Sequence, residues 1–198
     1  MKPKSLIATT LMMMVIVMGT ATAGLGLGDA MVDGDVKMKN VDGKMLSLDD
    51  IKGDKGTLVI FSSYHCPFVV GWQDVMVELG NTYMKKGIGV VFINSNDPAV
   101  AGDTYEKMQE MATAEKYEFP FVVDATSGVA KNFGAKKTPD VFLFDASGKL
   151  VYQGAIGEGA RKPSGGDIWL KDAMDAMLAG EPIDPAQTKA VGCSIKFR

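Results

Sequence analysis

The chain has little of two residue types that often reveal a function. Its 198 residues include only two cysteines, Cys66 and Cys193, and one histidine, His65. Two cysteines allow one disulfide, which excludes a disulfide framework of the kind found in small secreted domains. A single disulfide would serve either as one structural staple or in redox chemistry.

An excess of positive charge is also lacking. The formal net charge is −3, and leaving out the two positive charges of Lys2 and Lys4 takes it to −5. Such mild acidity gives no electrostatic footprint for nucleic acid. After residue 23 no stretch is apolar enough to cross a bilayer. We therefore expect no nucleic-acid partner and no stable membrane insertion of the mature chain.

Residues 1–23 have the pattern of a secretory signal peptide. Lys2 and Lys4 form a short basic region, an apolar run covers 6–18, and Ala-Thr-Ala at 21–23 is a small-residue cleavage signal. This order of basic, apolar and small residues is typical of exported proteins. We expect export to the periplasm or cell envelope of a bacterium. The alternative is an N-terminal anchor that is not cleaved.

The remaining part, about 175 residues, has the size of one domain. Residues 24–34 are rich in glycine and predict a flexible segment. Residues 35–180 carry the regular hydrophobic patterning of the domain. Residues 181–198 show no clear periodicity and predict a mobile C-terminal tail, which carries Cys193.

Hydrophobic periodicity predicts strands that alternate with helices between residues 35 and 180. An Asp-Gly turn joins the first two strands in a hairpin. The predicted strands are 36–39, 45–48, 57–61, 88–94, 119–123, 141–144 and 150–153, and the main helices are 67–86, 103–117, 127–133 and 168–178, the last capped by Asp167. This order predicts an α/β fold in which a mixed sheet carries helices on both faces.

Cys66 is the residue that points most directly to chemistry. It lies where the buried strand 57–61 passes into a helix, which Pro67 begins at the position where proline is best tolerated. The free N–H groups and positive dipole end of a helix N-terminus favour the thiolate, which is the reactive form of cysteine. The neighbouring His65 would lower the thiol pKa when protonated or relay a proton when neutral. Alternatively, His65 only shapes a solvent-facing loop.

Two further motifs complete a recognisable pattern. Thr138-Pro139 stands directly before an apolar strand, and Gly-Cys-Ser-Ile-Lys occupies 192–196. With the strand–Cys66–helix junction, these motifs resemble the thioredoxin-like superfamily. The closest resemblance is to its peroxiredoxin-like (AhpC/TSA, redoxin) branch and to a subgroup that keeps only the first active-site cysteine. The resemblance implies a three-layer thioredoxin-like sandwich with an N-terminal hairpin extension.

The resemblance also implies roles for individual residues. Cys66 would be the nucleophile of a thiol-dependent oxidoreductase that acts on a disulfide or a peroxide, and Pro139 would be a cis-proline facing it. Thr138 would pair its backbone with a substrate chain, and Ser63 and Pro67 would complete the substrate site. The implied partners are a thiol or disulfide protein, or a peroxide, and an external thiol reductant. No cofactor and no metal are implied.

The chain departs from the patterns of its relatives near Cys66. Val69 stands where thioredoxins carry their second cysteine. Val59 and Ser63 occupy the proline and threonine positions of the peroxiredoxin motif P-x-x-x-T-x-x-C. Peroxide activation also uses an arginine near the thiolate, and the chain has only Arg161 and Arg198.

Cys193 leaves three alternatives open. It is a resolving cysteine that folds back onto Cys66, one end of a structural disulfide, or a free or metal-binding thiol. A different class of protein also stays open: a non-catalytic thioredoxin-fold binding module with a structural disulfide or a soft-metal site. The distance between the two cysteines decides among these readings.

Overall fold

The computed structural model describes residues 24–159, 161, 163 and 165–198. The predicted signal peptide, 1–23, lies outside the described residues. Within the described part, no helix combines the length and the apolar character needed to span a membrane.

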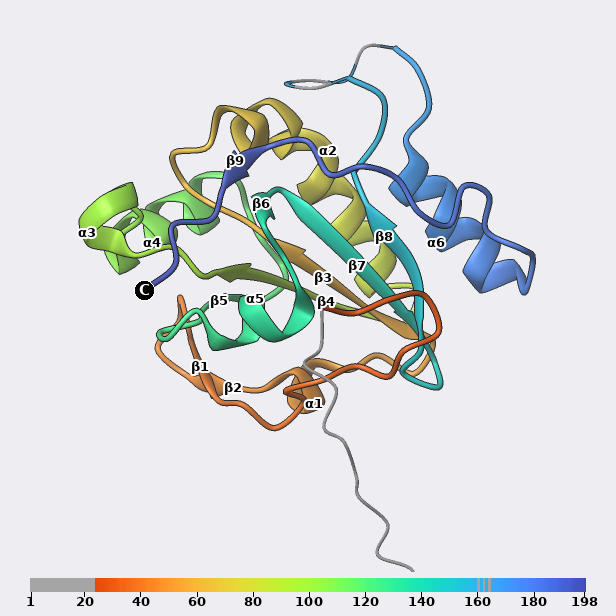
Figure 1. Cartoon of the computed structure of the whole chain (residues 1–198), viewed down its shortest axis with the longest axis horizontal. Coiled ribbons are helices and arrows are strands. Elements are labelled where there is room, and N and C mark those ends of the chain that lie inside the picture. The colour runs from red at the N-terminus through yellow and green to blue at the C-terminus, as the bar shows by residue number, and fades with distance from the viewer. Residues whose placement is uncertain (1–23, 160, 162, 164) are drawn as a thin grey trace, which may run out of the picture.

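Strands and helices alternate largely as the hydrophobic pattern predicts (Figure 1). The strands are β1 (Met38–Asn40), β2 (Met45–Leu46), β3 (Gly56–Phe61), β4 (Ile88–Asn94), β5 (Phe121–Val123), β6 (Lys137–Thr138), β7 (Asp140–Asp145), β8 (Leu150–Gly154) and β9 (Cys193–Ser194). The helices are α1 (Leu48–Ile51), α2 (Pro67–Met84), α3 (Pro98–Ala101), α4 (Tyr105–Ala114), α5 (Gly128–Phe133) and α6 (Trp169–Ala179).

Seven of these strands form a central mixed sheet in the order β2-β1-β5-β4-β3-β7-β8. β4 and β5 run parallel, whereas β1 is antiparallel to both of its neighbours and β7 is antiparallel to β3 and β8. The two halves of the sheet meet where β3 lies beside β4. There the N–H of Ser62 donates to the carbonyl of Ile93 at 2.8 Å. The expected thioredoxin-like α/β fold is confirmed.

Both faces of the sheet are covered, because successive residues of a strand point to opposite sides. In β3, Leu58 and Ile60 pack into one core cluster with residues of α2, α4 and α6. Val59 and Phe61 pack into a second cluster with residues of α1 and α5. All four side chains are fully buried. β3 therefore runs through the centre of the molecule and delivers its C-terminal end, just before Cys66, at a rigid position.

Two helix starts differ from the predictions. A short helix, α3, precedes α4, because Asp97 caps it by accepting a hydrogen bond from the N–H of Ala99. α4 then begins after Thr104, whose side chain accepts from the N–H of Lys107. At α6 the capping position is held by Ile168, without a side-chain cap, so the predicted Asp167 cap is wrong.

The two terminal segments pack against the domain. Residues 24–34 follow the β7–β8 turn, where the N–H of Gly28 donates to the carbonyl of Leu150 and that of Met31 to Gly148. The C-terminal segment crosses from α6 past β6 (Figure 1) and ends beside Asn96 and the start of α5, where the N–H of Arg198 donates to the Ser127 hydroxyl. Within it, β9 pairs antiparallel with β6. The segment predicted to be a mobile tail is anchored to the domain at several points, because its backbone finds partners that periodicity does not reveal.

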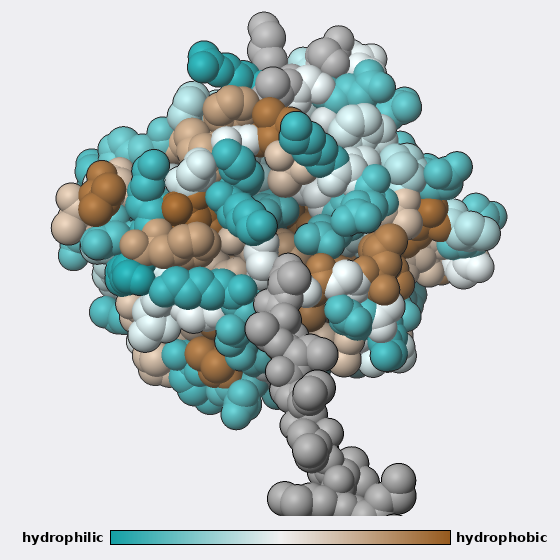
Figure 2. Space-filling view, viewed as in Figure 1, coloured by the Kyte–Doolittle hydropathy of each residue, from teal (hydrophilic) through white to brown (hydrophobic). Residues whose placement is uncertain are grey.

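The surface on the face seen in Figure 2 carries separate hydrophobic patches between hydrophilic side chains. Among the exposed large hydrophobic residues of the described chain are Val70 and Val100. Isolated apolar residues of this kind are normal on a protein surface. This face of the molecule therefore gives no sign of an extensive apolar docking area.

Candidate active site

Cys66 is held at the junction that the sequence predicts. It is the N-cap residue of α2, Pro67 is the first helical residue, and the carbonyl of Cys66 accepts the first helical hydrogen bond from Val70. The residue is only 2% exposed. Its thiol donates to the carbonyl oxygen of Thr138 at 2.9 Å. The peptide bond between Thr138 and Pro139 is cis, so the structure brings these three predicted residues together.

The surroundings of Cys66 favour its thiolate. Burial by itself would raise the pKa of the thiol. Hydrogen bonds to the sulfur, the largest from Cys193 and a smaller one from the backbone N–H of Val69, outweigh burial and lower the pKa of Cys66 below its usual value. The Val69 contribution is the helix N-terminus acting on the sulfur, since that N–H has no partner within the helix. Cys66 therefore has the electronic character of a nucleophile.

Cys193 lies next to Cys66 because of the β6–β9 pairing. In this two-stranded ribbon Cys193 stands opposite Thr138, the residue whose carbonyl binds the Cys66 thiol. The two thiols are close enough for each to shift the pKa of the other, and both cysteines are reduced. Burial, followed by the hydrogen bond to Cys66, raises the pKa of Cys193 to about 11. The two thiols thus differ: Cys66 loses its proton more readily than an ordinary thiol, and Cys193 loses its proton less readily.

The close approach of β9 depends on a small residue before Cys193. A Cβ atom at Gly192 would stand 2.1 Å from the carbonyl oxygen of Thr138, a distance at which the two chains would have to separate. Glycine therefore lets the tail reach the Thr138 edge. That edge is where a substrate chain was expected to pair, so in this state β9 occupies the position predicted for the substrate.

Ser63 and His65 face a buried carboxylate that the sequence did not single out. The side chain of Asp103 is fully buried, and its carboxylate accepts hydrogen bonds from the Ser63 hydroxyl at 2.6 Å and from the backbone N–H of His65 at 3.1 Å. The His65 Nδ1 lies 3.3 Å from the same carboxylate, and the His65 side chain is 52% exposed. Asp103 therefore fixes the loop before Cys66, and neither Ser63 nor His65 hydrogen-bonds the sulfur in this arrangement.

The two arginines have different surroundings. The Arg198 guanidinium donates to backbone carbonyls of Asn96, Asp124 and Ala125. It is thus a clamp on the C-terminus. The Arg161 guanidinium lies 5.5 Å from the centre of the Phe68 ring, in the first turn of α2. Of the two, Arg161 is the one beside the helix that begins at Cys66.

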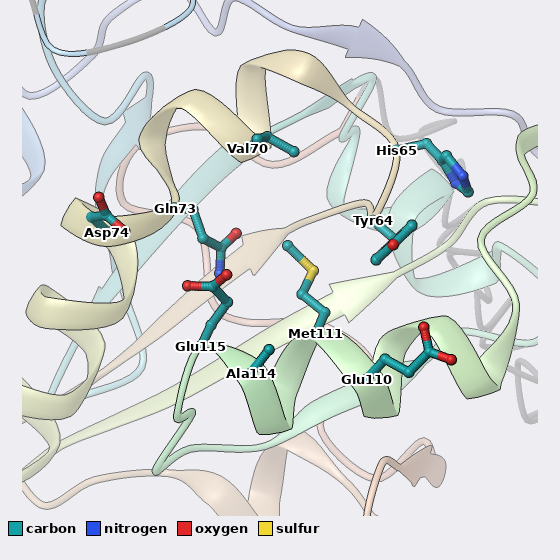
Figure 3. A pocket seen from close by; sticks show the side chains of 9 residues that line it. All are labelled: Tyr64, His65, Val70, Gln73, Asp74, Glu110, Met111, Ala114 and Glu115. Atoms are coloured by element: carbon teal, nitrogen blue, oxygen red, sulfur yellow. The ribbon is translucent and has the colours of Figure 1, made fainter.

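Two cavities lie near the site, one beside the loop before Cys66 and one beside the cis-proline. One of about 630 Å³ lies between α2 and α4, beside Tyr64 and His65 (Figure 3). The other, of about 270 Å³, is lined by Pro139, two tryptophans and Val191. The second cavity borders the cis-proline directly. Small reactants would therefore find space beside the cis-proline.

A metal centre finds no support in the described residues. Among them no group of three or more His, Cys, Asp and Glu side chains is arranged to hold a metal ion. Cys66 and Cys193 contact each other, but His65 is turned to Asp103. In this geometry His65 is therefore not placed to be the third ligand of a soft-metal site with Cys66 and Cys193.

The fold and the site together define a thioredoxin-like protein with a cysteine of lowered pKa at a strand–helix junction and a cis-proline beside it. Residues 27–153 match the AhpC/TSA family. Since this match spans more than half of the chain, the chain belongs to the AhpC/TSA family. No curated protein is significantly similar to it.

Solved structures share both the fold and, in two cases, substantial identity. An uncharacterized conserved protein from Geobacillus kaustophilus is 38% identical, with a TM-score of 0.81, over 87% of this chain and 93% of the other. A hypothetical protein from Sinorhizobium meliloti is 35% identical, with a TM-score of 0.80, over 88% and 96%. A putative thiol:disulfide interchange protein DsbE from Chlorobium tepidum is 22% identical, with a TM-score of 0.61, over 78% and 99%. This last likeness concerns the fold alone.

Proposed function

We propose that this protein is a thiol oxidoreductase that cycles between a Cys66/Cys193 dithiol and an intrachain disulfide. The observation that carries the proposal is the β6–β9 pairing, which sets Cys193 opposite Thr138 while the Cys66 thiol binds the Thr138 carbonyl. Membership of the AhpC/TSA family supports a redox enzyme in general. The contact between the thiols supports Cys193 as the resolving partner.

The proposed cycle has two half-reactions. With a peroxide, the Cys66 thiolate attacks the O–O bond, releases an alcohol or water after protonation, and becomes a sulfenic acid. The Cys193 thiol then forms an S–S bond to Cys66 and releases water. With a disulfide, Cys66 displaces one thiolate and forms a mixed disulfide, and Cys193 attacks the Cys66 sulfur and displaces the other. Two equivalents of an external thiol restore the dithiol and leave as a disulfide.

The difference between the two thiol pKa values suits this order of events. The attacking cysteine needs to be a thiolate, and the pKa of Cys66 is lowered. Cys193, with a pKa of about 11, stays protonated while Cys66 is a thiolate, partly because two neighbouring negative charges are unfavourable. Once Cys66 is oxidised that charge is gone, and Cys193 loses its proton more easily. Cys193 is thus protonated and unreactive before Cys66 is oxidised, and it can attack Cys66 afterwards.

The test is the intact mass of the reduced mature protein after one equivalent of hydrogen peroxide or of a small disulfide, with free thiols trapped by alkylation. We expect the loss of two hydrogens within one chain. In Cys193→Ser, we expect a Cys66 sulfenic acid or a mixed disulfide in its place.

The matched control is Cys66→Ser, in which the same treatment should leave Cys193 alkylatable. Oxidised wild-type protein in which Cys193 is still trapped as a free thiol would overturn the resolving role of Cys193. Wild-type protein in which both thiols remain after oxidant would overturn the enzyme proposal as a whole and favour a binding module.

We further propose that the protein is exported with residues 1–23 removed. The support is the sequence: the basic residues Lys2 and Lys4, the apolar run 6–18 and the small residues at 21–23. The test is the N-terminal mass of the protein from cell-envelope and cytoplasmic fractions. A chain beginning at Gly24 in the envelope fraction is expected. A full-length chain confined to the cytoplasm would contradict the proposal.

A further inference from the structure

The segment that carries Cys193 is anchored on both sides of the cysteine. On the N-terminal side, the N–H of Thr188 donates to the carbonyl of Gln153 at 2.9 Å, and its side-chain oxygen accepts from the N–H of Ala155 at 2.8 Å. On the C-terminal side, Ile195 is buried at 6% exposure and its N–H donates to the carbonyl of Lys136. Residues 189–194 are therefore a strap between two fixed points.

Asn96 is the main anchor of the strap after Ile195. Its side-chain oxygen accepts from the N–H of Lys196 at 2.7 Å. Its backbone carbonyl accepts from the Arg198 guanidinium at 3.1 Å. The next residue, Asp97, donates its N–H to the carbonyl of Lys196 at 2.6 Å. The end of β4 thus fixes the position of the C-terminal segment.

The other end of the Asn96 side chain binds the reactive loop through Asp103. The Asn96 Nδ2 donates to Asp103 Oδ2 at 2.7 Å, and that same carboxylate holds Ser63 and the backbone of His65. Asn96 is 4% exposed and Asp103 is 3% exposed, so these bonds are shielded from water. Buried bonds to a charged partner are about twice as strong as neutral ones.

We propose that Asn96, through its contact with Asp103, is a positioning residue that holds the Cys193 strap in register with the Cys66 loop. The side-chain amide of Asn96 links the two parts. Its oxygen binds the backbone just after the strap, and its nitrogen binds Asp103, which holds the Cys66 loop. The inference rests on the proposed function, because the role of the register is to set the approach of Cys193 to an oxidised Cys66. Asn96 touches neither sulfur, so it acts through the backbone positions on either side.

The experiment separates the two steps in the full mature chain. An aromatic disulfide whose released thiolate absorbs light first loads Cys66 and releases one thiolate; Cys193 then attacks Cys66 and releases the second. The first phase reports the reactivity of Cys66, and the second phase reports the resolution step. Cys193→Ser should show the first phase alone.

Replacing Asn96 should slow the second phase. For Asn96→Leu, which keeps the side-chain size but makes no hydrogen bonds, we expect the second phase to slow about tenfold, the scale of losing a bond to a charged group. Arg198→Gln, at the end of the C-terminal segment beyond the strap, should slow the second phase by a smaller factor. The control is Asn132→Leu, since Asn132 also donates to a carboxylate, that of Asp33, but contacts neither the strap nor the loop.

A pH profile distinguishes positioning from simple packing. In Asn96→Asp, two ionised carboxyl groups would face each other, and the second phase should be slow at about pH 8. At about pH 5 one carboxyl group of the pair is protonated and can donate as the amide did, so the rate relative to wild type at the same pH should recover. The other charged or titratable side chains nearby are His65, Asp97, Asp124 and Arg198, and all are present in the wild-type reference.

The outcomes separate the two proposals. A wild-type chain with no second phase overturns the proposed function, and the positioning role falls with it. A normal second phase in both Asn96→Leu and Arg198→Gln overturns the positioning role alone. If Asn96→Leu does not fold, Asn96→Asp and Arg198→Gln decide: slowing with recovery at low pH in Asn96→Asp supports the role, and wild-type rates in both variants overturn it.

Discussion

Cys66 and Cys193 touch each other, but different kinds of structure hold them. Cys66 caps an 18-residue helix and follows a fully buried strand, so its position depends on the elements that adjoin it in sequence. Cys193 lies on a two-residue strand that pairs with Lys137 and Thr138, and Asn96 and Ser127 bind residues that follow this strand. The first cysteine is fixed by local structure and the second by contacts distant in sequence.

The difference between the two settings has a chemical counterpart. Nearby N–H and thiol donors lower the pKa of Cys66, whereas burial and the adjacent Cys66 raise that of Cys193. The rigidly held Cys66 is therefore the cysteine suited to attack. Cys193, on the two-residue strand β9, is the cysteine suited to move. A strap anchored at both ends allows a local shift of Cys193 without unfolding of the tail.

The largest effect should come from replacing the rigidly held Cys66. Cys66→Ser should lower turnover of a disulfide or peroxide, measured with an excess of thiol reductant, at least about a hundredfold, because a serine hydroxyl without an activating base is a poor nucleophile. Cys193→Ser is the matched variant and should retain the first half-reaction. Full turnover by Cys66→Ser would mean that the chemistry lies elsewhere.

The next effect should come from the strap. Gly192→Ala places a Cβ against the Thr138 carbonyl and should push β9 away from β6. We expect Cys66–Cys193 disulfide formation to slow about tenfold, since overpacking costs roughly 1–3 kcal/mol. The rate is followed by alkylation and intact mass. Gly26→Ala, where the nearest atom would be 3.6 Å from the new Cβ, is the control and should behave like wild type.

A third effect concerns Asp140, which begins β7 two residues after Thr138. Burial raises the pKa of Asp140 to about 7, from a usual value of 3.8. The protonated form thus stabilises the fold fully below the unfolded pKa, and this stabilisation is lost as the pH rises through about 7. Asp140→Asn should raise the free energy of unfolding at about pH 8 by roughly 1–3 kcal/mol and change it little at about pH 4. Urea unfolding at the two pH values tests this; equal effects at both would show that Asp140 is not protonated by burial.

The smallest effect should come from His65. Its ring lies against Asp103 and is half exposed, so it makes no hydrogen bond to the sulfur. We expect His65→Gln to change the rate of Cys66 alkylation by less than about threefold across the pH range in which histidine titrates. Tyr64→Phe is a neighbouring control on the same loop. A change of tenfold or more, confined to His65→Gln, would assign His65 a direct part in activating Cys66.

Much of the fold could be predicted because its signals are local. The continuous apolar runs gave β3 and β4 within a residue of their bounds, and Pro67 marked the start of α2. Short elements were harder: α3 is a single turn that one capping residue, Asp97, is enough to form. At α6 the chain begins its helix without the side-chain cap that Asp167 predicted.

The candidate site divides in the same way. The placement of Cys66 at the helix start and Thr138-Pro139 before a strand could be read from neighbouring residues. Asp103 and Asn96 could not, because a polar residue before a helix or after a strand is ordinary in sequence, and only burial makes their hydrogen bonds informative. The residues around Asn96, just after β4, gave no hint of the carboxylate that it binds.

Local pattern was therefore enough to place Cys66 at a helix start and Thr138-Pro139 before a strand, because helix starts, buried strands and X-Pro steps depend on adjacent residues. The thioredoxin-like fold and the reactive role of Cys66 were what the resemblance of these motifs implied. The sequence left three alternatives open for Cys193. The tertiary structure places its thiol beside that of Cys66. The physical reason is that a strand as short as β9 has no pattern of its own. Its position comes from the free edge of β6, a glycine small enough to approach Thr138, and the anchors at Asn96 and Arg198.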